Sequence, residues 1–310
     1  MKHFYSFILF LIIVQFSFAQ NSNTADSVKH WKFGGTYSFT INQVSLTNWQ
    51  AGGENSVSGN TILNVFGNYS KNKFSWNNNL TLAYGLSQIG DESLRKTDDR
   101  IEFNSSVGYT ATKNWDYTAF AIFRSQFTDG YDYPNDSDLI STFFAPAYVL
   151  GGLGMEYKPN DWFRINISPA TGKITFVTNQ ELANQGAYGV EEAEYDTAGN
   201  ILTKGENVRY EIGGSVKIII KKDLMENVSV QTQVDLFSNY VENPQNIDVN
   251  WDFLLNLKVN EWLSASLSTN LIYDDDINII VEEDPEGNAV KKGPRTQFRQ
   301  IFGAGLNIKF

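Results

Sequence analysis

The sequence predicts an all-β fold, namely a membrane-spanning antiparallel up-and-down β-barrel of about 12 strands. Three observations lead to this prediction. Apolar and polar residues alternate along runs that are long enough to cross a bilayer. Short and long connections follow one another in turn, and the chain begins with a short apolar segment behind a basic start.

The alternation has a period of two residues. Between Arg100 and Thr110 and between Ile247 and Asn260, the odd-numbered residues are mostly apolar and the even-numbered ones mostly polar. This period predicts strands with one apolar and one polar face. The runs approach the roughly 9–11 residues that a tilted strand needs to cross a bilayer. We predict strands over 32–45, 55–70, 73–89, 98–111, 116–128, 148–158, 162–178, 207–221, 227–240, 246–259, 262–274 and 296–310.

The connections alternate in length. Those at 71–72, 112–115, 159–161, 222–226 and 260–261 are tight, whereas 129–147, 179–206 and 275–295 are long. Short periplasmic turns and long extracellular loops are typical of outer-membrane barrels, and an even strand count leaves both termini in the periplasm. Every proline except Pro169 falls in a connection, so we expect a bulge or a break at Pro169.

The N-terminus predicts export. Lys2 and His3 precede an apolar run that ends in Ser17-Phe18-Ala19, a pattern that signal peptidase cuts, here before Gln20. An uncleaved anchor helix is the alternative. We therefore expect a signal peptide over 1–19, a short periplasmic segment over 20–30, a barrel over 31–310, and a location in the cell outer membrane.

Composition narrows the function classes. The chain has no Cys, which excludes a lipoprotein, disulfides and thiolate metal sites. Its formal net charge of −11 is unsuited to binding nucleic acid. His3 and His30 are its only histidines, so the usual pairs of nucleophile and base are missing from the barrel. We expect no catalytic site and no cofactor, although a hydrolase that uses carboxylates alone stays open.

Charged residues on the polar faces predict the character of the lumen. Both signs occur in similar numbers, which suits paired networks better than a pore lined by one sign of charge. The principal lumenal positions are Arg100, Glu102, Arg124, Arg164, Arg209, Glu211, Asp235, Asp252 and Arg299. We also expect Asp116, Glu156, Lys217, Asp248, Lys258 and Lys309 to point inward. The acidic runs 274–276 and 282–284 could bind Ca²⁺ or be solvated surface.

The last predicted strand ends on a C-terminal aromatic residue. Phe298, Phe302, Leu306, Ile308 and Phe310 share one face. This pattern resembles the signal by which barrel-assembly machinery selects its clients. We therefore expect that machinery and outer-membrane lipid as partners, with Phe310 as part of the assembly signal.

Two stretches resemble a family of Bacteroidota outer-membrane proteins known only as a domain of unknown function. The first is WKFGG at 31–35 with NQVSLTNWQAGGENS at 42–56, and the second is SPATGKITFV at 168–177 with GAYGV at 186–190. The resemblance implies a barrel in the outer membrane, and no activity.

Both motifs fall in the external half of the predicted barrel. They contain a candidate constriction or ligand site, and the alternative is a packed loop that needs glycine for positive φ angles. The candidate residues are Asn48, Trp49, Gly52, Gly53, Asn55, Pro169, Gly172 and Lys173.

Two functions remain open. The first is a non-enzymatic narrow pore or transport-linked channel of the outer membrane. The alternative is a plugged structural barrel that binds a partner as a subunit of an envelope complex. The sequence does not decide between them.

Overall fold

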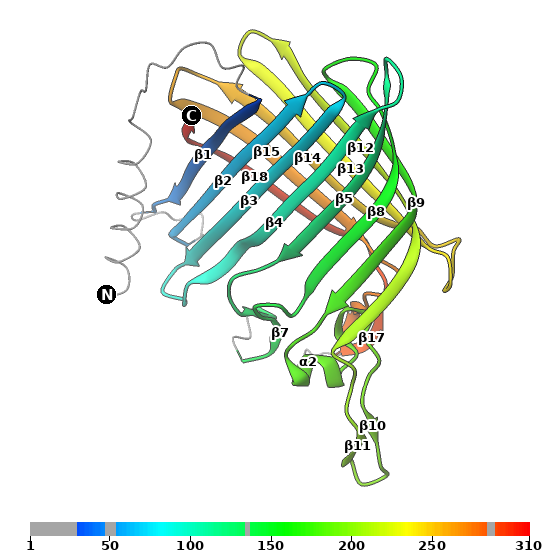
Figure 1. The fold of residues 1–310 in the computed structure, drawn as a ribbon. Coiled ribbons are helices and arrows are strands. Elements are labelled where there is room, and N and C mark those ends of the chain that lie inside the picture. The colour runs from blue at the N-terminus through cyan, green and yellow to red at the C-terminus, as the bar shows by residue number, and fades with distance from the viewer. Residues whose placement is uncertain (1–29, 47–53, 134–136, 284–288) are drawn as a thin grey trace. The chain divides into compact units, whose positions relative to one another are not determined.

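Twelve antiparallel strands form a closed barrel in the computed structural model, which describes residues 30–46, 54–133, 137–283 and 289–310 (Figure 1). Each barrel strand pairs with the next one along the chain, and the last strand pairs with the first. The predicted up-and-down barrel is therefore confirmed. Within the described part of the chain, no helix is long and apolar enough to cross a membrane.

All twelve predicted strands are present, with ends that differ by a few residues. The barrel strands are β1 (Trp31–Val44), β2 (Ser56–Lys71), β3 (Phe74–Ile89), β4 (Arg95–Thr110), β5 (Trp115–Ser125), β8 (Ala147–Tyr157), β9 (Phe163–Phe176), β12 (Val208–Met225), β13 (Val228–Asn239), β14 (Asp248–Lys258), β15 (Leu263–Tyr273) and β18 (Gln297–Lys309). The largest difference is at β12, which continues to Met225, so the turn predicted at 222–226 is tighter than expected.

Short turns lie at one end of the barrel and the longer connections at the other, which we call the turn end and the loop end (Figure 1). In the residues that the structure describes, the loop-end connections contain three small hairpins, one helix and one 3-10 turn. These are β6 (Gly130–Tyr131) with β7 (Leu139–Ser141), α2 (Gln180–Asn184), η1 (Ala187–Gly189), β10 (Glu194–Tyr195) with β11 (Ile201–Thr203), and β16 (Ile279–Glu283) with β17 (Ala289–Gly293).

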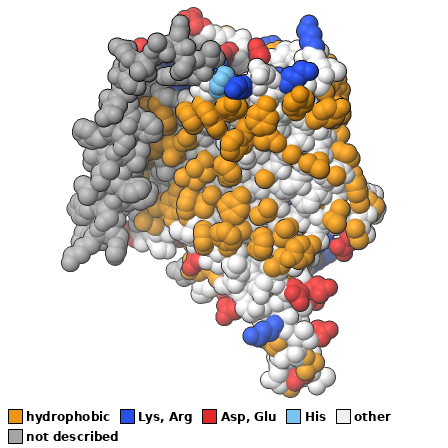
Figure 2. Space-filling model, in the orientation of Figure 1, with side chains coloured by type: hydrophobic (Ala, Val, Ile, Leu, Met, Phe, Trp, Pro, Cys, Tyr) orange, Lys and Arg blue, Asp and Glu red, His pale blue; other side chains and the backbone are white. Residues whose placement is uncertain are grey.

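The outer surface of the barrel is apolar. Figure 2 shows hydrophobic side chains spread over the strands, with charged side chains beyond them at both ends. At the turn end the ring of Trp31 lies 5.2 Å from that of Tyr69 and 5.6 Å from that of Trp76, centroid to centroid. An apolar band bordered by aromatic residues matches the depth profile of a bilayer.

A β-bulge interrupts β9 at Pro169, as predicted. Ser168 pairs with Ser215 and Thr171 with Gly213. Between these two pairs β9 advances by three residues and β12 by two, so β9 contains one extra residue. Pro169 is exposed on the outer surface. At a bulge the ladder is already interrupted, so the missing N–H of proline costs no hydrogen bond between strands. Because of the extra residue, each residue of β9 after the bulge points to the opposite face from the one that uninterrupted alternation predicts.

The barrel closes where the first and last strands meet. β1 pairs with β18 only over Thr36–Thr40, whereas it pairs with β2 along its whole length. Phe310 continues this seam, because its backbone N–H donates to the Gly35 carbonyl (3.1 Å) and its carbonyl accepts from the Gly35 N–H (2.9 Å). The Phe310 ring lies against the Cα of Gly35, where a side chain would collide with it.

Candidate functional site

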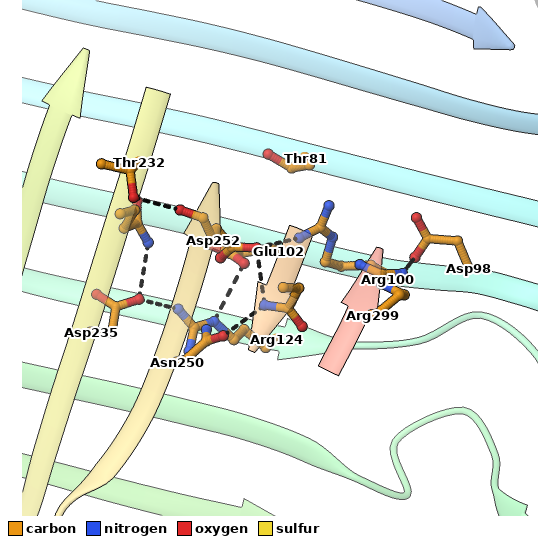
Figure 3. Close-up of polar contacts among 12 residues, drawn as sticks. Thr81, Asp98, Arg100, Glu102, Arg124, Thr232, Asp235, Asn250, Asp252 and Arg299 are labelled. Atoms are coloured by element: carbon orange, nitrogen blue, oxygen red, sulfur yellow. Dashed lines mark hydrogen bonds and ion pairs between the residues drawn. The ribbon is translucent and has the colours of Figure 1, made fainter. Parts of the chain in front are cut away.

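A network of ion pairs crosses the lumen in the loop-end half of the barrel (Figure 3). We call it the lumenal network; its members are Arg100, Glu102, Arg124, Lys217, Asp235 and Asp252. Arg100 Nη1 lies 3.3 Å from Asp252 Oδ1, and these residues come from β4 and β14, on opposite sides of the barrel. The alternation of β4 and β14 turns both side chains inward.

Arg124 is the centre of this network. Its Nη2 lies 2.6 Å from Asp235 Oδ2, and its Nε lies 3.4 Å from Glu102 Oε2. Lys217 Nζ approaches Asp235 Oδ1 at 3.3 Å. Three cations thus face three carboxylates, and the network balances its own charge. Such pairs gain from the reduced dielectric only when hydrogen bonds complete them.

Neutral side chains supply some of those hydrogen bonds. The amide of Asn104 donates to Glu102 (2.7 Å), that of Gln233 to Asp235 (2.9 Å) and that of Asn270 to Asp252 (3.1 Å). A second bridge joins Arg299 to Asp98, which is only 4% exposed. The two bridges connect β4 with β14 and with β18, so they restrict the lumen.

A second charged group lies nearer the loop end, on β9, β12, β14 and the connections beside them. We call it the loop-end cluster; its members are Lys173, Arg209, Glu211, Glu242, Asp248, Asp274 and Asp276. Lys173 Nζ lies 2.8 Å from Asp248 Oδ2 and 3.3 Å from carboxylate oxygens of both Glu211 and Asp274. Arg209 Nη2 lies 2.8 Å from Asp276 Oδ2 and 3.0 Å from Glu242 Oε2.

The connection from 177 to 207 folds over this cluster. Val177, Leu182, Ala183 and Val190 are buried with Ala145 in a small apolar core. Asn179 caps α2 by accepting from the N–H groups of the first turn. The connection therefore has a packed structure of its own at the mouth of the barrel.

Two contacts tie the end of this connection to its neighbours. The Tyr188 hydroxyl donates to the Ile140 carbonyl (2.6 Å), and Arg209 donates to the Gly189 carbonyl (3.0 Å). Burial raises the pKa of the Tyr188 hydroxyl, which therefore stays protonated and able to donate. Gly186 and Gly189 have φ angles of 67° and 80°, so the packed-loop interpretation explains these two glycines.

Lys173 shows what the sequence pattern missed. Arg164 and Lys173 both belong to the inward face of β9, although their sequence positions differ by nine, an odd number. Uninterrupted alternation places Lys173 outside, and the bulge at Pro169 brings it inside. The pairing of Lys173 with Glu211, a predicted lumenal residue, could have revealed this.

The other candidate residues have varied positions. Arg164 lines the lumen and has no ion pair within 4.0 Å among the described residues. Asn55 accepts from the Leu46 N–H at 2.6 Å, and Gly172 lies on the outer face beside Gly151. Asn48, Trp49, Gly52 and Gly53 lie outside the described residues.

The acidic run 274–276 is not simply solvated surface. Asp274 is 9% exposed and pairs with Lys173, so that interpretation is wrong for this residue. In the described ranges, no three His, Cys, Asp or Glu residues are grouped so that they could hold a metal ion.

A cavity of about 2130 Å³ occupies the lumen. Near the turn end its lining includes Asn68, Asn77 and Lys309, and at the loop end it includes Asp274 and Tyr188. Asn, Ser and Thr side chains dominate the wall formed by β1, β2, β3 and β15. The cavity therefore has a polar wall along these four strands and reaches residues of both barrel ends.

One family model matches part of the chain. Residues 41–131, less than a third of the chain, match a family described as a protein of unknown function (DUF3078). This match fits the expected unknown-function family. No curated protein matches the chain.

Several solved structures are similar to this chain. An outer membrane channel from Pseudomonas putida F1 has 11% identity and a TM-score of 0.40, over 93% of this chain and 100% of that one. The translocator domain of the autotransporter NalP from Neisseria meningitidis has 8% identity and a TM-score of 0.32, over 99% and 96%. OmpT of Vibrio cholerae has 9% identity and a TM-score of 0.32, over 94% and 100%. At these TM-scores the similarities carry no argument about function.

Proposed function

We propose that this protein is a non-enzymatic outer-membrane channel that conducts small hydrophilic solutes through a narrow passage. This proposal rests on the cavity of about 2130 Å³, whose lining reaches from the turn end to the loop end and is polar along β1, β2, β3 and β15. The apolar outer surface supports a bilayer location, and the apolar segment at the N-terminus supports export.

The lumenal network supports a narrow passage. Its arginines and carboxylates meet across the barrel, between β4 and β14 and between β5 and β13. Side chains that cross a lumen reduce its free cross-section. We therefore expect low single-channel conductance, compared with wide porins.

Conductance in planar lipid bilayers tests this proposal. The informative variant is Ser266→Trp, because Ser266 lines the cavity on β15. Its matched control is Ala265→Trp, whose side chain points to the other face of the same strand. We expect Ser266→Trp to lower the conductance and Ala265→Trp to leave it unchanged. A correctly folded wild-type protein without channel activity would refute the proposal.

The second candidate is a plugged barrel that serves as a partner-binding subunit of an envelope complex. The folded 177–207 connection and the crossing ion pairs favour it, because both restrict the lumen. Purification in mild detergent after crosslinking in cells tests it. Recovery of the chain alone would count against a partner.

A further inference from the structure

The loop-end cluster has more negative than positive charge. Its two cations, Lys173 and Arg209, are paired with five carboxylates. The cluster therefore carries a formal excess of three negative charges, in contrast to the balanced lumenal network. Three of the carboxylates, Asp248, Asp274 and Asp276, line the cavity together with Lys173. A confined site with one sign of excess charge concentrates solutes of the opposite sign.

Glu211 provides an independent observation, because within the described ranges the cluster contains a buried carboxylate oxygen that receives no hydrogen bond. The residue is 4% exposed, and its Oε1 has no hydrogen-bond partner among the residues that the structure describes. Buried polar atoms are almost always satisfied. Its other oxygen, Oε2, faces Lys173. An ammonium group is thus already the preferred partner of this carboxylate.

Aromatic side chains lie beside these carboxylates. Lys173 Nζ lies 5.3 Å from the centroid of the Phe237 ring. Tyr148, Tyr188 and Phe237 line the same cavity. Aromatic faces attract cations, and carboxylates with aromatic rings are the usual recognition elements for organic ammonium groups.

We propose that the loop-end cluster is a cation-selective subsite and that Asp248, Asp274 and Asp276 determine its selectivity. It admits positively charged solutes, including those with an ammonium group, and disfavours anions. This inference rests on the proposed channel function. Lys173 already occupies part of the subsite as a tethered cation, so its removal should strengthen the selectivity.

Reversal potentials in a KCl gradient test the proposal in bilayers. We expect wild-type channels to prefer K⁺ to Cl⁻, and the Asp248→Asn/Asp274→Asn variant to lower that permeability ratio by about tenfold. Lys173→Met should raise the ratio. A purely structural role of the cluster would not change selectivity in opposite directions in these two variants.

The matched control removes the same charge elsewhere at the loop end. Glu194→Gln/Asp196→Asn lies on the β10–β11 hairpin, which does not line the cavity. It should leave the permeability ratio unchanged. Equal effects of the two double variants, or a wild-type channel that prefers Cl⁻, would overturn the inference. A change in electrophoretic mobility on boiling verifies that each variant is folded.

Calorimetry provides a readout that does not need conductance. Hexaamminecobalt(III) carries a triple positive charge and presents N–H donors, which match the excess negative charge and the cavity-lining carboxylates Asp248, Asp274 and Asp276. We expect the folded wild type to bind it at least about tenfold more tightly than Asp248→Asn/Asp274→Asn does, a difference of roughly 1.4 kcal/mol. A wild-type protein that binds hexaamminecobalt(III) but shows no conductance would refute the proposed channel function and leave the subsite standing. Equal binding by both proteins would refute the subsite.

Discussion

Replacing Arg124 by Met should destabilise the barrel measurably, because Arg124 joins two carboxylates inside the lumen. The side chains of Arg124, Glu102 and Asp235 are only 20%, 10% and 16% exposed. Removing one partner of a buried pair costs about 3–5 kcal/mol when the other charge remains unpaired. Asp235 retains Lys217 at 3.3 Å. Glu102 retains the hydrogen bond from the Asn104 amide but, among the described residues, no ion pair within 4.0 Å. Since water reaches part of the lumen, we expect a loss of about 2–3 kcal/mol.

Urea unfolding in phospholipid vesicles, followed by the fluorescence of the seven tryptophans, measures this loss. Arg164→Met is the matched control, because Arg164 is lumenal but has no ion pair within 4.0 Å in the described part of the barrel. Its effect should stay within about 0.5 kcal/mol. Arg124→Met/Glu102→Gln should recover at least about 1 kcal/mol relative to the sum of the single variants. Equal losses for Arg124→Met and Arg164→Met, or strict additivity, would refute the reasoning.

Three further predictions concern insertion and export. Leu255→Arg or Leu306→Arg should impair insertion by about 2–4 kcal/mol, because alternation from the lumenal Asp252 and Arg299 turns both side chains outward. Vesicle folding assays should find the lumenal change Leu254→Arg tolerated. Deleting Phe310 should strongly lower outer-membrane abundance in cells but barely change the unfolding temperature of refolded protein; normal abundance would contradict the assembly role. Mass spectrometry should find the mature protein starting at or near Gln20, and an attached apolar segment would disprove cleavage.

The strands could be predicted because the bilayer and the lumen impose a period of two on every one of them. The same alternation predicts which face of a strand each side chain occupies, and it correctly predicts that Arg100 and Asp252 point into the lumen. It could not show that they meet, because β4 and β14 lie on opposite sides of the barrel and their contact depends on the curvature of the whole sheet.

The loop-end cluster was harder to predict. Lys173 points inward because of the bulge in β9. Pro169 indicates that a bulge is present, but it does not determine how many extra residues the bulge contains. Asp274 follows β15 directly and is itself followed by two more aspartates, a pattern typical of solvated surface. Its burial depends on Lys173, which is 101 residues away in the sequence. Only the closed barrel brings such residues together.

The seam between β1 and β18 has a consequence for biogenesis. Because the first and last strands close the ring, no shorter chain can complete it, and until Phe310 arrives two strand edges stay open to pairing with other molecules. The entropic cost of bringing β1 and β18 together grows only with the logarithm of the number of residues between them. The main risk of aggregation therefore comes from how long the two strand edges stay unpaired. A premature stop before β18 should therefore yield an open sheet that aggregates through its unpaired strand edges.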